Sequence, residues 1–406
     1  MIFYDITAFE KDGFLPIISI NLLFPLMEIQ ETQKLKYFLT LIMIGIILMC
    51  CPSYGKNPSL TPQERMENSP QYQNGKFHNA KRDLYDVGAA WRAAFKDILL
   101  GERVDPVPQE PPPIQRLTGT DFYIQDDQTL RFVRLGHSTI MLQIGEKVWL
   151  TDPVFSERVS LFQWVGPKRF HPVPIKMEDL PPIEGVLISH NHFDHLDHDT
   201  ILQLKDRVKY FFVPLGLGET LVSWGVLLEK ITELDWWEKA QIGNVELIST
   251  PAQHFSGRGL FVSDKTLWTS WVIRTPQYSV YFSGDSGYFE GFQEIGEKYG
   301  PFDLSFLECG AYHNSWRTMH MMPEDNLKAF KDLKGKVLVP IHNGTFDLAF
   351  HSWYDPMEQL MTFARKAQIQ FVIPLMGQIV DGNSIPKTVA WWKPSKETTK
   401  TKDFLK

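Results

Sequence analysis

The feature that most constrains this chain is the run Ser189-His190-Asn191-His192-Phe193-Asp194-His195-Leu196-Asp197, which is dense in imidazoles and carboxylates. It directly follows the apolar stretch 185–189, which has the pattern of a short buried strand. Imidazole and carboxylate groups are common ligands of Zn²⁺ and similar ions. The spacing H-x-H-x-D-H therefore predicts a two-metal site, and the alternative of a histidine-rich surface loop is disfavoured by this context.

Further candidate ligands also follow predicted strands. His254 follows the strand-like segment 245–250, Asp285 follows 279–282, and His342 follows 337–341. Binding residues often lie on loops that a rigid scaffold positions. We therefore expect a fold that brings these three strand ends to the run at 190–195.

This ordered set resembles the ligand set of the metallo-β-lactamase superfamily. Longer motifs are similar to those of the N-acyl-phosphatidylethanolamine-hydrolysing phospholipase D family, at 133–139, 150–156, 166–170, 187–197, 212–216, 233–238, 300–304 and 341–346. The resemblance implies an α/β (α+β) fold, a four-layer αββα sandwich. The absence of a Gly-x-Gly-x-x-Gly motif after the first strand also disfavours a dinucleotide fold.

Carried over residue by residue, the resemblance implies two Zn²⁺ ions per chain. One ion would be bound by His190, His192 and His254, the other by Asp194, His195 and His342, and Asp285 would bridge both. Two ions about 3.5–4 Å apart lower the pKa of a shared water and clamp the attacking and phosphoryl oxygens. The ligands alone do not separate Zn²⁺ from Fe²⁺ or Mn²⁺.

Catalytic roles are expected for Asp285, Asp194 and His320. His320 matches a histidine near the metals in the phospholipase relatives, where it could protonate a leaving alkoxide or stabilise an oxyanion. The alternative is a histidine that merely precedes the helix start at Pro323. Asp152, after the predicted strand 148–151, could fix the tautomer of a metal-bound imidazole, or simply form an Asp-Pro turn.

The other histidines are expected to serve packing or hydrogen bonding. His137 belongs to a family motif and is expected to pack or to form hydrogen bonds behind the ligands. Surface or structural positions are predicted for His78, His171, His198, His313 and His351.

Ligand identity separates the chemistries within the superfamily. As the resemblance implies, redox di-iron members carry Glu where this chain has His192, and β-lactamases generally lack the carboxylate that Asp285 supplies. RNA-processing members share the ligands, but 41 Lys and Arg against 48 Asp and Glu, a formal net charge of −7, oppose phosphate-backbone binding. Phosphoester hydrolysis is therefore favoured, with no nucleic-acid partner.

The resemblance implies a zinc-dependent phosphodiesterase that cleaves N-acyl-phosphatidylethanolamine to phosphatidic acid and N-acylethanolamine through a metal-bridging hydroxide. Two alternatives stay open. The first is a dinuclear-zinc hydrolase of a lactone, thioester or cyclic phosphodiester in a soluble small molecule, and the second is a non-catalytic metal-binding protein.

Aromatic residues in predicted loops favour a phospholipid or other amphiphilic substrate and contact with a membrane surface. Each buried methylene of an acyl chain stabilises a complex by about 0.8 kcal/mol. These residues are Phe162, Trp164, Phe170, Trp236, Trp237, Phe255, Phe261 and Trp316, and core packing is the alternative. Lys168 and Arg169 are candidates for phosphate contact or plain solvent-facing cations.

Residues 1–51 are predicted to be an N-terminal extension that ends in a signal-peptide-like or lipoprotein-like segment. Lys34 and Lys36 precede the apolar run 37–51, which is shorter than the roughly 20 residues of a membrane span. The chain is therefore expected to be extracytoplasmic, either exported or membrane-anchored. Met27 is an alternative start.

Cysteine usage excludes a disulfide framework in the mature domain. Cys50 or Cys51, at the end of the apolar run, is a candidate for lipidation. Only Cys309 lies beyond them, so a cysteine-based metal site is excluded as well.

The rest of the chain is predicted to form an arm, a catalytic domain and a tail. Residues 52–116 are a Pro/Asn-rich arm with one amphipathic helix at 84–100, whose apolar face docks on the domain, on a second chain in a homodimer or on a bilayer. Residues 75–79 resemble arms that lie across phospholipase-type domains. Residues 117–385 are the catalytic domain, and 386–406 are a polar C-terminal tail.

Within the catalytic domain, apolar patterns predict alternating strands and helices. Strands are expected at 130–135, 139–144, 148–151, 185–189, 210–213, 245–250, 267–275, 279–282, 304–307, 336–340 and 370–373. Helices are expected at 201–208, 218–224, 289–299, 323–333 and 356–367.

Overall fold

The computed structural model describes residues 61–80, 103–258 and 264–393. All described residues belong to one compact unit. Several predictions lie outside the described residues: the leader with its apolar run and cysteines, the helix at 84–100, and Phe261.

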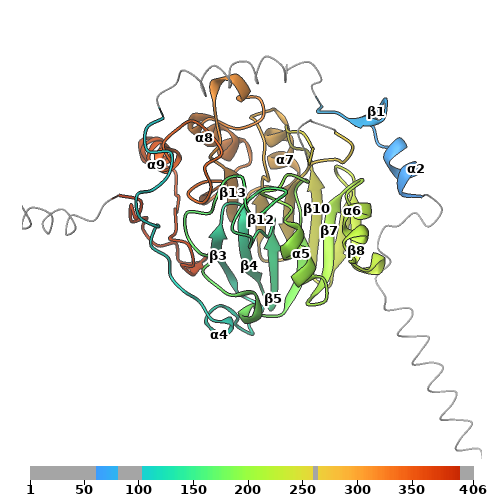
Figure 1. The fold of residues 1–406 in the computed structure, drawn as a ribbon, viewed down its shortest axis with the longest axis horizontal. Helices are drawn as coiled ribbons and strands as arrows, with labels where there is room; N and C mark the ends of the chain where they lie inside the picture. Colours follow the sequence, from blue (N-terminus) through green and yellow to red (C-terminus); the bar gives the residue numbers. More distant parts are fainter. Residues whose placement is uncertain (1–60, 81–102, 259–263, 394–406) are drawn as a thin grey trace, which may run out of the picture. The chain divides into compact units, whose positions relative to one another are not determined.

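Two mixed sheets form the centre of the described structure (Figure 1). The first has the order β15-β3-β4-β5-β6-β7-β8, and the second has the order β14-β13-β12-β11-β10-β9. The first contains β3 Leu130–Gly136, β4 Thr139–Ile144, β5 Lys147–Thr151, β6 Ile183–Leu187, β7 Val208–Pro214, β8 Ile231–Leu234 and β15 Val380–Asp381. The second contains β9 Lys239–Ile242, β10 Val245–Thr250, β11 Ser270–Arg274, β12 Ser279–Phe282, β13 Leu304–Glu308 and β14 Leu338–Ile341.

Helices occupy the connections and the arm. The α-helices are α2 Pro62–Glu67, α4 Gly119–Phe122, α5 His198–Leu204, α6 Gly218–Ser223, α7 Gly291–Tyr299, α8 Pro323–Asp332 and α9 Asp355–Lys366. Short 3-10 turns lie at Met177–Asp179, Leu228–Lys230 and Asn314–Trp316, and the arm also contains the hairpin β1 Tyr72–Gln73 and β2 Lys76–Phe77.

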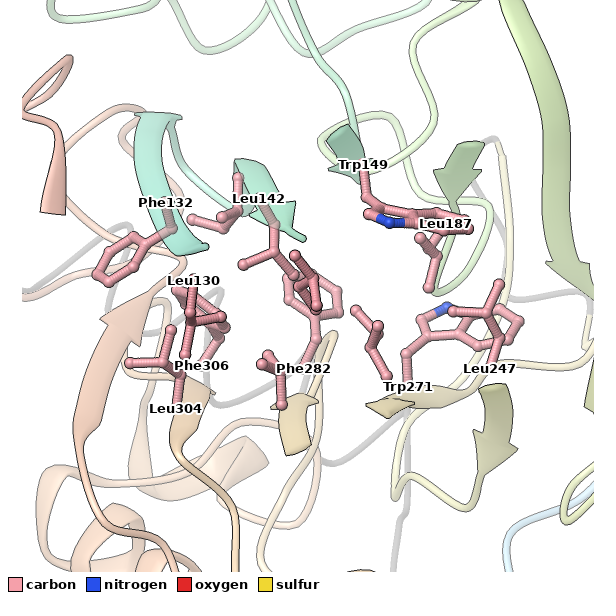
Figure 2. Close-up of a cluster of buried hydrophobic side chains, with 14 of the residues drawn as sticks. Leu130, Phe132, Leu142, Trp149, Leu187, Leu247, Trp271, Phe282, Leu304 and Phe306 are labelled. Carbon is pink, nitrogen blue, oxygen red and sulfur yellow. The ribbon is translucent and has the colours of Figure 1, made fainter. Parts of the chain in front are cut away.

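Three apolar clusters hold four layers together. Between the sheets, Trp149 and Leu187 of the first sheet pack against Leu247 and Trp271 of the second (Figure 2). A second cluster packs α5 and α6 on the outer face of the first sheet, and a third packs α7, α8 and α9 on that of the second. Because both faces of each sheet are covered, strands such as β4 are buried along their whole length. This arrangement confirms the predicted αββα sandwich.

Most predicted elements form, but the strand β6 and the helix α5 have bounds that differ from the predicted ones. The strand predicted at 185–189 ends at Leu187, because the N–H of Ser189 donates to the side chain of Asp152. The helix predicted at 201–208 begins at His198 instead. Asp197 is its N-cap residue but makes no side-chain cap, since its carboxylate is bonded elsewhere.

Other differences concern short strands. The segment 370–373 forms only a bridge between Phe371 and Leu338 rather than a strand. The strands β8 and β9 were not predicted, since only two of the four residues in each are buried and neither has the continuous apolar run of the predicted strands. Short runs of this kind lie at the limit of what periodicity detects.

The described part of the arm lies against the catalytic domain, as the resemblance implied for residues 75–79. Phe77 is buried in a cluster with Trp236 and Trp268. The Asn79 side chain donates to the C=O of His254 at 2.8 Å and accepts from its N–H at 3.0 Å. The arm thus braces the loop that carries a candidate ligand.

At the other end of the domain, Trp392 packs in the cluster around α9, so packed structure extends at least to this residue. In the ranges that the structure describes, no helix has the length and apolar character needed to cross a membrane.

Candidate metal centre

The candidate ligands come from loops that follow four strands at one end of the sheets. The run at 190–195 follows β6, His254 follows β10, Asp285 follows β12, and His342 comes directly after β14. β10, β12 and β14 point in the same direction, since β10 and β12 are both antiparallel to β11 and β14 is parallel to β12 through β13. The structure therefore brings together every residue that the sequence predicts as a ligand.

The first group consists of His190, His192, His254 and Asp285, with one possible ligand atom each within 4.8 Å of the others. His192 Nδ1 lies 2.8 Å from His190 Nε2 and 3.3 Å from His254 Nε2. Asp285 Oδ2 lies 3.9 Å from His190 Nε2 and 3.7 Å from His254 Nε2. Nitrogen and carboxylate donors at these separations could hold one cation.

The second group consists of His137, Asp194, His195 and His342. Asp194 Oδ2 lies 3.0 Å from His137 Nε2, 3.4 Å from His195 Nε2 and 3.2 Å from His342 Nε2. Asp285 also reaches this group, because its oxygens lie 3.2 Å from His195 Nε2 and 3.0 Å from His342 Nε2. Asp285 therefore faces both groups.

The arrangement fits bound cations better than hydrogen bonds alone. His195 Nε2 and Asp285 Oδ1 are buried and lack a hydrogen-bond partner within the described residues, although they lie only 3.2 Å apart. Two ligands about 2.0–2.2 Å from one tetrahedral ion are roughly 3.3–3.6 Å apart. Since buried polar atoms rarely lack a partner, these two atoms are well suited to share an ion.

Two carboxylates, the buried Asp285 and the partly buried Asp194, give the centre its negative charge. Burial on its own raises the pKa of Asp285, but the imidazoles of His195 and His342 hold that pKa well below its usual range. Burial also raises the pKa of Asp194, but His195 and His137 hold that pKa well below its usual range. Burial lowers the pKa of His342, but Asp285 and Asp194 outweigh it and raise the value to about 10. Protons on imidazoles and a bound cation thus compete to balance the same charge.

Asp152 holds one of the candidate ligands from behind. Its buried carboxylate accepts hydrogen bonds from His195 Nδ1 at 2.7 Å and from the N–H and hydroxyl of Ser189 at 2.7 and 2.6 Å. Its backbone is left-handed, with φ 37°, which turns the chain after β5. The bond to Nδ1 leaves Nε2 of His195 to face the carboxylates of the centre.

Other imidazoles are fixed in a similar way. His190 Nδ1 lies 2.9 Å from the hydroxyl of Ser189, and His254 Nδ1 lies 3.1 Å from the C=O of Met319. In both residues the opposite nitrogen, Nε2, faces the first group. The tautomers of these rings are therefore set by groups outside the centre.

His137 is part of the centre rather than a distant packing residue. It bonds to Asp194, and its ring centroid lies 4.0 Å from that of His342. Its C=O also accepts the N–H of His342 at 3.1 Å. His137 thus joins the turn after β3 to the loop after β14, in line with the packing and hydrogen bonding that the sequence suggested.

His320 lies at the edge of the centre and is held by Glu308, which sequence reasoning missed. The His320 ring centroid is 5.1 Å from that of His254 and 5.4 Å from that of His342. Its Nδ1 donates to Glu308 Oε1 at 2.9 Å, and Glu308 also accepts the N–H of Ser286 at 3.2 Å. Glu308 is the last residue of β13, so the strand-end rule that located the ligands also applies to it.

The side chains of Lys168 and Arg169, which were considered for phosphate contact, are both engaged elsewhere. Arg169 is buried, and its guanidinium donates to the C=O of Val154 at 2.6 Å and of Ser156 at 3.3 Å. Lys168 pairs with Glu157 at 2.8 Å on the surface. Arg169 is therefore a structural residue that ties the loop after β5 together.

The aromatic candidates divide between core and rim. Trp236 is buried and its Nε1 donates to the C=O of Trp268 at 2.7 Å, so packing explains it. Trp237 is partly buried in the neighbouring clusters. Phe255, in contrast, lies with its ring centroid 4.6 Å from that of His192, beside the first group.

We expect the replacement Asp152→Asn to weaken cation binding by about 10–100-fold, the usual effect of removing a partner that orients a metal-bound imidazole. The amide has one acceptor oxygen, so it cannot accept all three hydrogen bonds that the two carboxylate oxygens accept from His195 and Ser189. Zinc competition with a chelator would measure the change, with Asp199→Asn on the exposed start of α5 as the control. Equal affinities for wild type and Asp152→Asn would contradict this role.

We also expect cation affinity to rise with pH. The pKa of His342 is raised to about 10 in the ion-free centre, so below that pH the ring holds a proton that an ion must displace. The logarithm of zinc affinity should increase by about one per pH unit for each displaced proton. Titrations between about pH 6 and 8, corrected for chelator protonation, would test this, and a flat profile would argue against it.

Comparisons with known proteins agree with this geometry. The β-lactamase superfamily domain matches residues 148–343. An uncharacterized protein of Mycobacterium tuberculosis is 40% identical over 335 residues, 80% of this chain and 88% of that protein. The N-acyl-phosphatidylethanolamine-hydrolyzing phospholipase D 1 of Caenorhabditis elegans is 34% identical over 285 residues, 66% of this chain and 79% of that protein.

A solved structure shares the fold. It is a metallo hydrolase from the archaeon Ignicoccus hospitalis, with a TM-score of 0.50 and 24% identity over 62% of this chain and 98% of that one. The sandwich, the clustered histidines and aspartates, and the relatives lead to one conclusion: the chain belongs to the metallo-β-lactamase superfamily of metal-dependent hydrolases and resembles the N-acyl-phosphatidylethanolamine-hydrolysing phospholipase D enzymes.

Proposed function

We propose that this protein is a dinuclear zinc phosphodiesterase that hydrolyses N-acyl-phosphatidylethanolamine to phosphatidic acid and N-acylethanolamine. The observation that carries the proposal is the position of Asp285, whose carboxylate faces both groups of imidazoles. The named phospholipase relative supports the substrate class. Imidazole-rich donor sets of this kind suit Zn²⁺.

In this proposal each group holds one ion. His190, His192 and His254 would bind the first, Asp194, His195 and His342 the second, and Asp285 both. Two bound zinc ions would supply a nucleophilic water near neutral pH and would neutralise the phosphoryl oxygens. The chain's contribution is to fix the donor atoms rigidly, since Asp152, Ser189 and Met319 bond to the outer nitrogens of the imidazoles.

His320 is the proposed proton donor to the leaving alkoxide. Its Nδ1 is engaged by Glu308, so Nε2 is the nitrogen available to a substrate. The side chain is 14% exposed, whereas that of Glu308 is fully buried. Glu308 therefore acts as a positioning residue that holds the ring between the ligand groups and the solvent side.

The phospholipase relative supports an amphiphilic substrate, and a hollow of mixed polar and apolar lining lies beside the centre. A pocket of about 310 Å³, counted with the solvent space at its mouth, adjoins the candidate ligand His342. Its lining mixes the apolar Phe346, Leu348 and Trp353 with the polar Asn343, Asp347 and His351. A hollow with both kinds of side chain is compatible with a substrate that has a polar headgroup and an apolar part.

The location and the assembly belong to the proposal as well. The leader with its apolar run supports an extracytoplasmic position, exported or membrane-anchored, where a membrane lipid would be within reach. A homodimer is part of the same hypothesis.

Zinc-reconstituted protein should release a fatty-acyl ethanolamide and phosphatidic acid from detergent-dispersed N-acyl-phosphatidylethanolamine, detected by mass spectrometry. Asp285→Asn should lose this activity by several orders of magnitude, because it removes the carboxylate that faces both groups. Faster turnover of soluble lactones, thioesters or cyclic phosphodiesters than of the phospholipid would defeat the lipid assignment while keeping the hydrolase.

Glu308→Gln should slow the release of alkoxide leaving groups by about 10²-fold, the range expected when a positioned proton donor is lost. Cleavage of bis(p-nitrophenyl) phosphate should change little, since p-nitrophenolate leaves without protonation. His320→Asn should show the same contrast between the two substrates. Equal losses on both substrates, at unchanged zinc content, would show that Glu308 only supports the fold.

A further inference from the structure

A short stretch of the loop between β5 and β6 exposes a concentration of apolar side chains. Leu161, Phe162, Trp164 and Val165 are 70%, 50%, 77% and 45% exposed. Within the ranges that the structure describes, Phe162 and Trp164 are the aromatic members of the set of exposed large apolar residues. Their rings stack on each other, with centroids 5.6 Å apart, and so form one continuous apolar tip.

The loop below this tip is held in shape by its own hydrogen bonds. Gln163 accepts the N–H of Arg158 at 3.0 Å and donates to the C=O of the same residue at 3.0 Å. Arg158 and Lys168 form an antiparallel bridge, and Val159 N–H donates to the C=O of Pro167 at 3.2 Å. The exposed aromatic rings are therefore presented by a preformed loop, which reduces the entropy lost when they bind.

A glycine at the neck of the loop also fixes its path. Gly166 has a φ of +99°, and a Cβ added there would lie 2.6 Å from the Cβ of Ser160. A larger residue would therefore push the two sides of the neck apart. The local sequence thus favours one loop shape.

The base of the same loop is attached to the metal-binding run. Val159 is buried in a small cluster with Phe346, and Phe193 of the run packs against that cluster. The N–H of Ser156 donates to Asp197 Oδ2 at 3.0 Å, and its hydroxyl donates to Asp197 Oδ1 at 2.9 Å. Anything that binds the apolar tip is therefore positioned relative to the candidate ligands by packed, hydrogen-bonded structure.

We propose that the tip 161–165 inserts into the headgroup region of a lipid bilayer and docks the catalytic domain on the membrane surface. Trp favours that region because its ring combines an apolar body with a polar N–H, and Phe and Leu are buried there as apolar anchors. The chain has a net charge of −7, and the neighbouring Lys168 is paired with Glu157. Insertion of apolar side chains, rather than attraction to anionic lipid, is therefore the expected mode.

A second copy of the chain fits the tip less well. A stable protein interface buries about 1,600 Å² in total, whereas four adjacent side chains supply a few hundred at most. The use of the tip in lipid hydrolysis rests on the proposed function, but binding to a bilayer does not.

Binding can be tested with the full chain and phosphatidylcholine vesicles that contain dibrominated acyl chains, which quench tryptophan only at short range. We expect quenching in the wild type that Trp164→Phe largely removes, although it replaces only one of twelve tryptophans. Vesicles without bromine are the control. Equal quenching in Trp164→Phe and the wild type would overturn the proposal, even if the N-terminal segment binds the vesicles.

A kinetic test separates the docking from the chemistry. The double replacement Phe162→Ser with Trp164→Ser should slow hydrolysis of vesicle-embedded N-acyl-phosphatidylethanolamine by about tenfold or more, since it removes two apolar anchors. Hydrolysis of soluble bis(p-nitrophenyl) phosphate should stay unchanged. Leu228→Ser and Val389→Ser, at side chains 63% and 75% exposed elsewhere, are matched controls.

The outcomes are distinguishable. If the double variant hydrolyses the vesicle substrate as fast as the wild type and the matched controls, the docking proposal is wrong. If the wild type lacks activity on the phospholipid but Trp164 is still quenched in vesicles, the docking proposal survives and the proposed substrate does not.

Discussion

The centre depends on two carboxylates, Asp194 and Asp285, that are held among imidazoles out of reach of most solvent. Burial opposes their ionisation, yet the neighbouring imidazoles keep the pKa of each well below its usual range. Buried negative charge of this kind has to be balanced by protons or cations. The sandwich makes the balance possible, because strands of its two sheets end at one place and deliver donors from both sides.

Strand ends supply the residues that orient ligands as well as the candidate ligands themselves. Asp152 follows β5 and holds His195, and Glu308 ends β13 and holds His320. Each of these carboxylates lies one strand away from a loop that carries candidate ligands, in the order of the sheets. A rigid sheet thus fixes donor atoms and their supports together, which is what a centre that must not reorganise requires.

The candidate ligands could be named from the sequence, because a polar residue that follows an apolar run is conspicuous, and the structure groups them. Glu308 was missed although it obeys the same rule, since a single acidic residue at the end of 304–308 also suits a solvent-exposed strand end. Arg169 and Trp236 were candidates for substrate contact, but both are buried and structural. Burial of a long cation or of a loop tryptophan depends on tertiary contacts that periodicity does not report.

The loop after β5 would meet two opposed requirements of the proposed lipid hydrolase. A metal centre needs burial and fixed donors, whereas a lipid substrate has to enter from a fluid surface. Asp197 of the run accepts hydrogen bonds from Ser156 of this loop, and Arg169 ties the loop to itself through the C=O of Val154. Because the connection is short and bonded, the tip cannot tilt freely relative to the centre. Contact with a surface at the tip would therefore also set the distance between that surface and the candidate ligands.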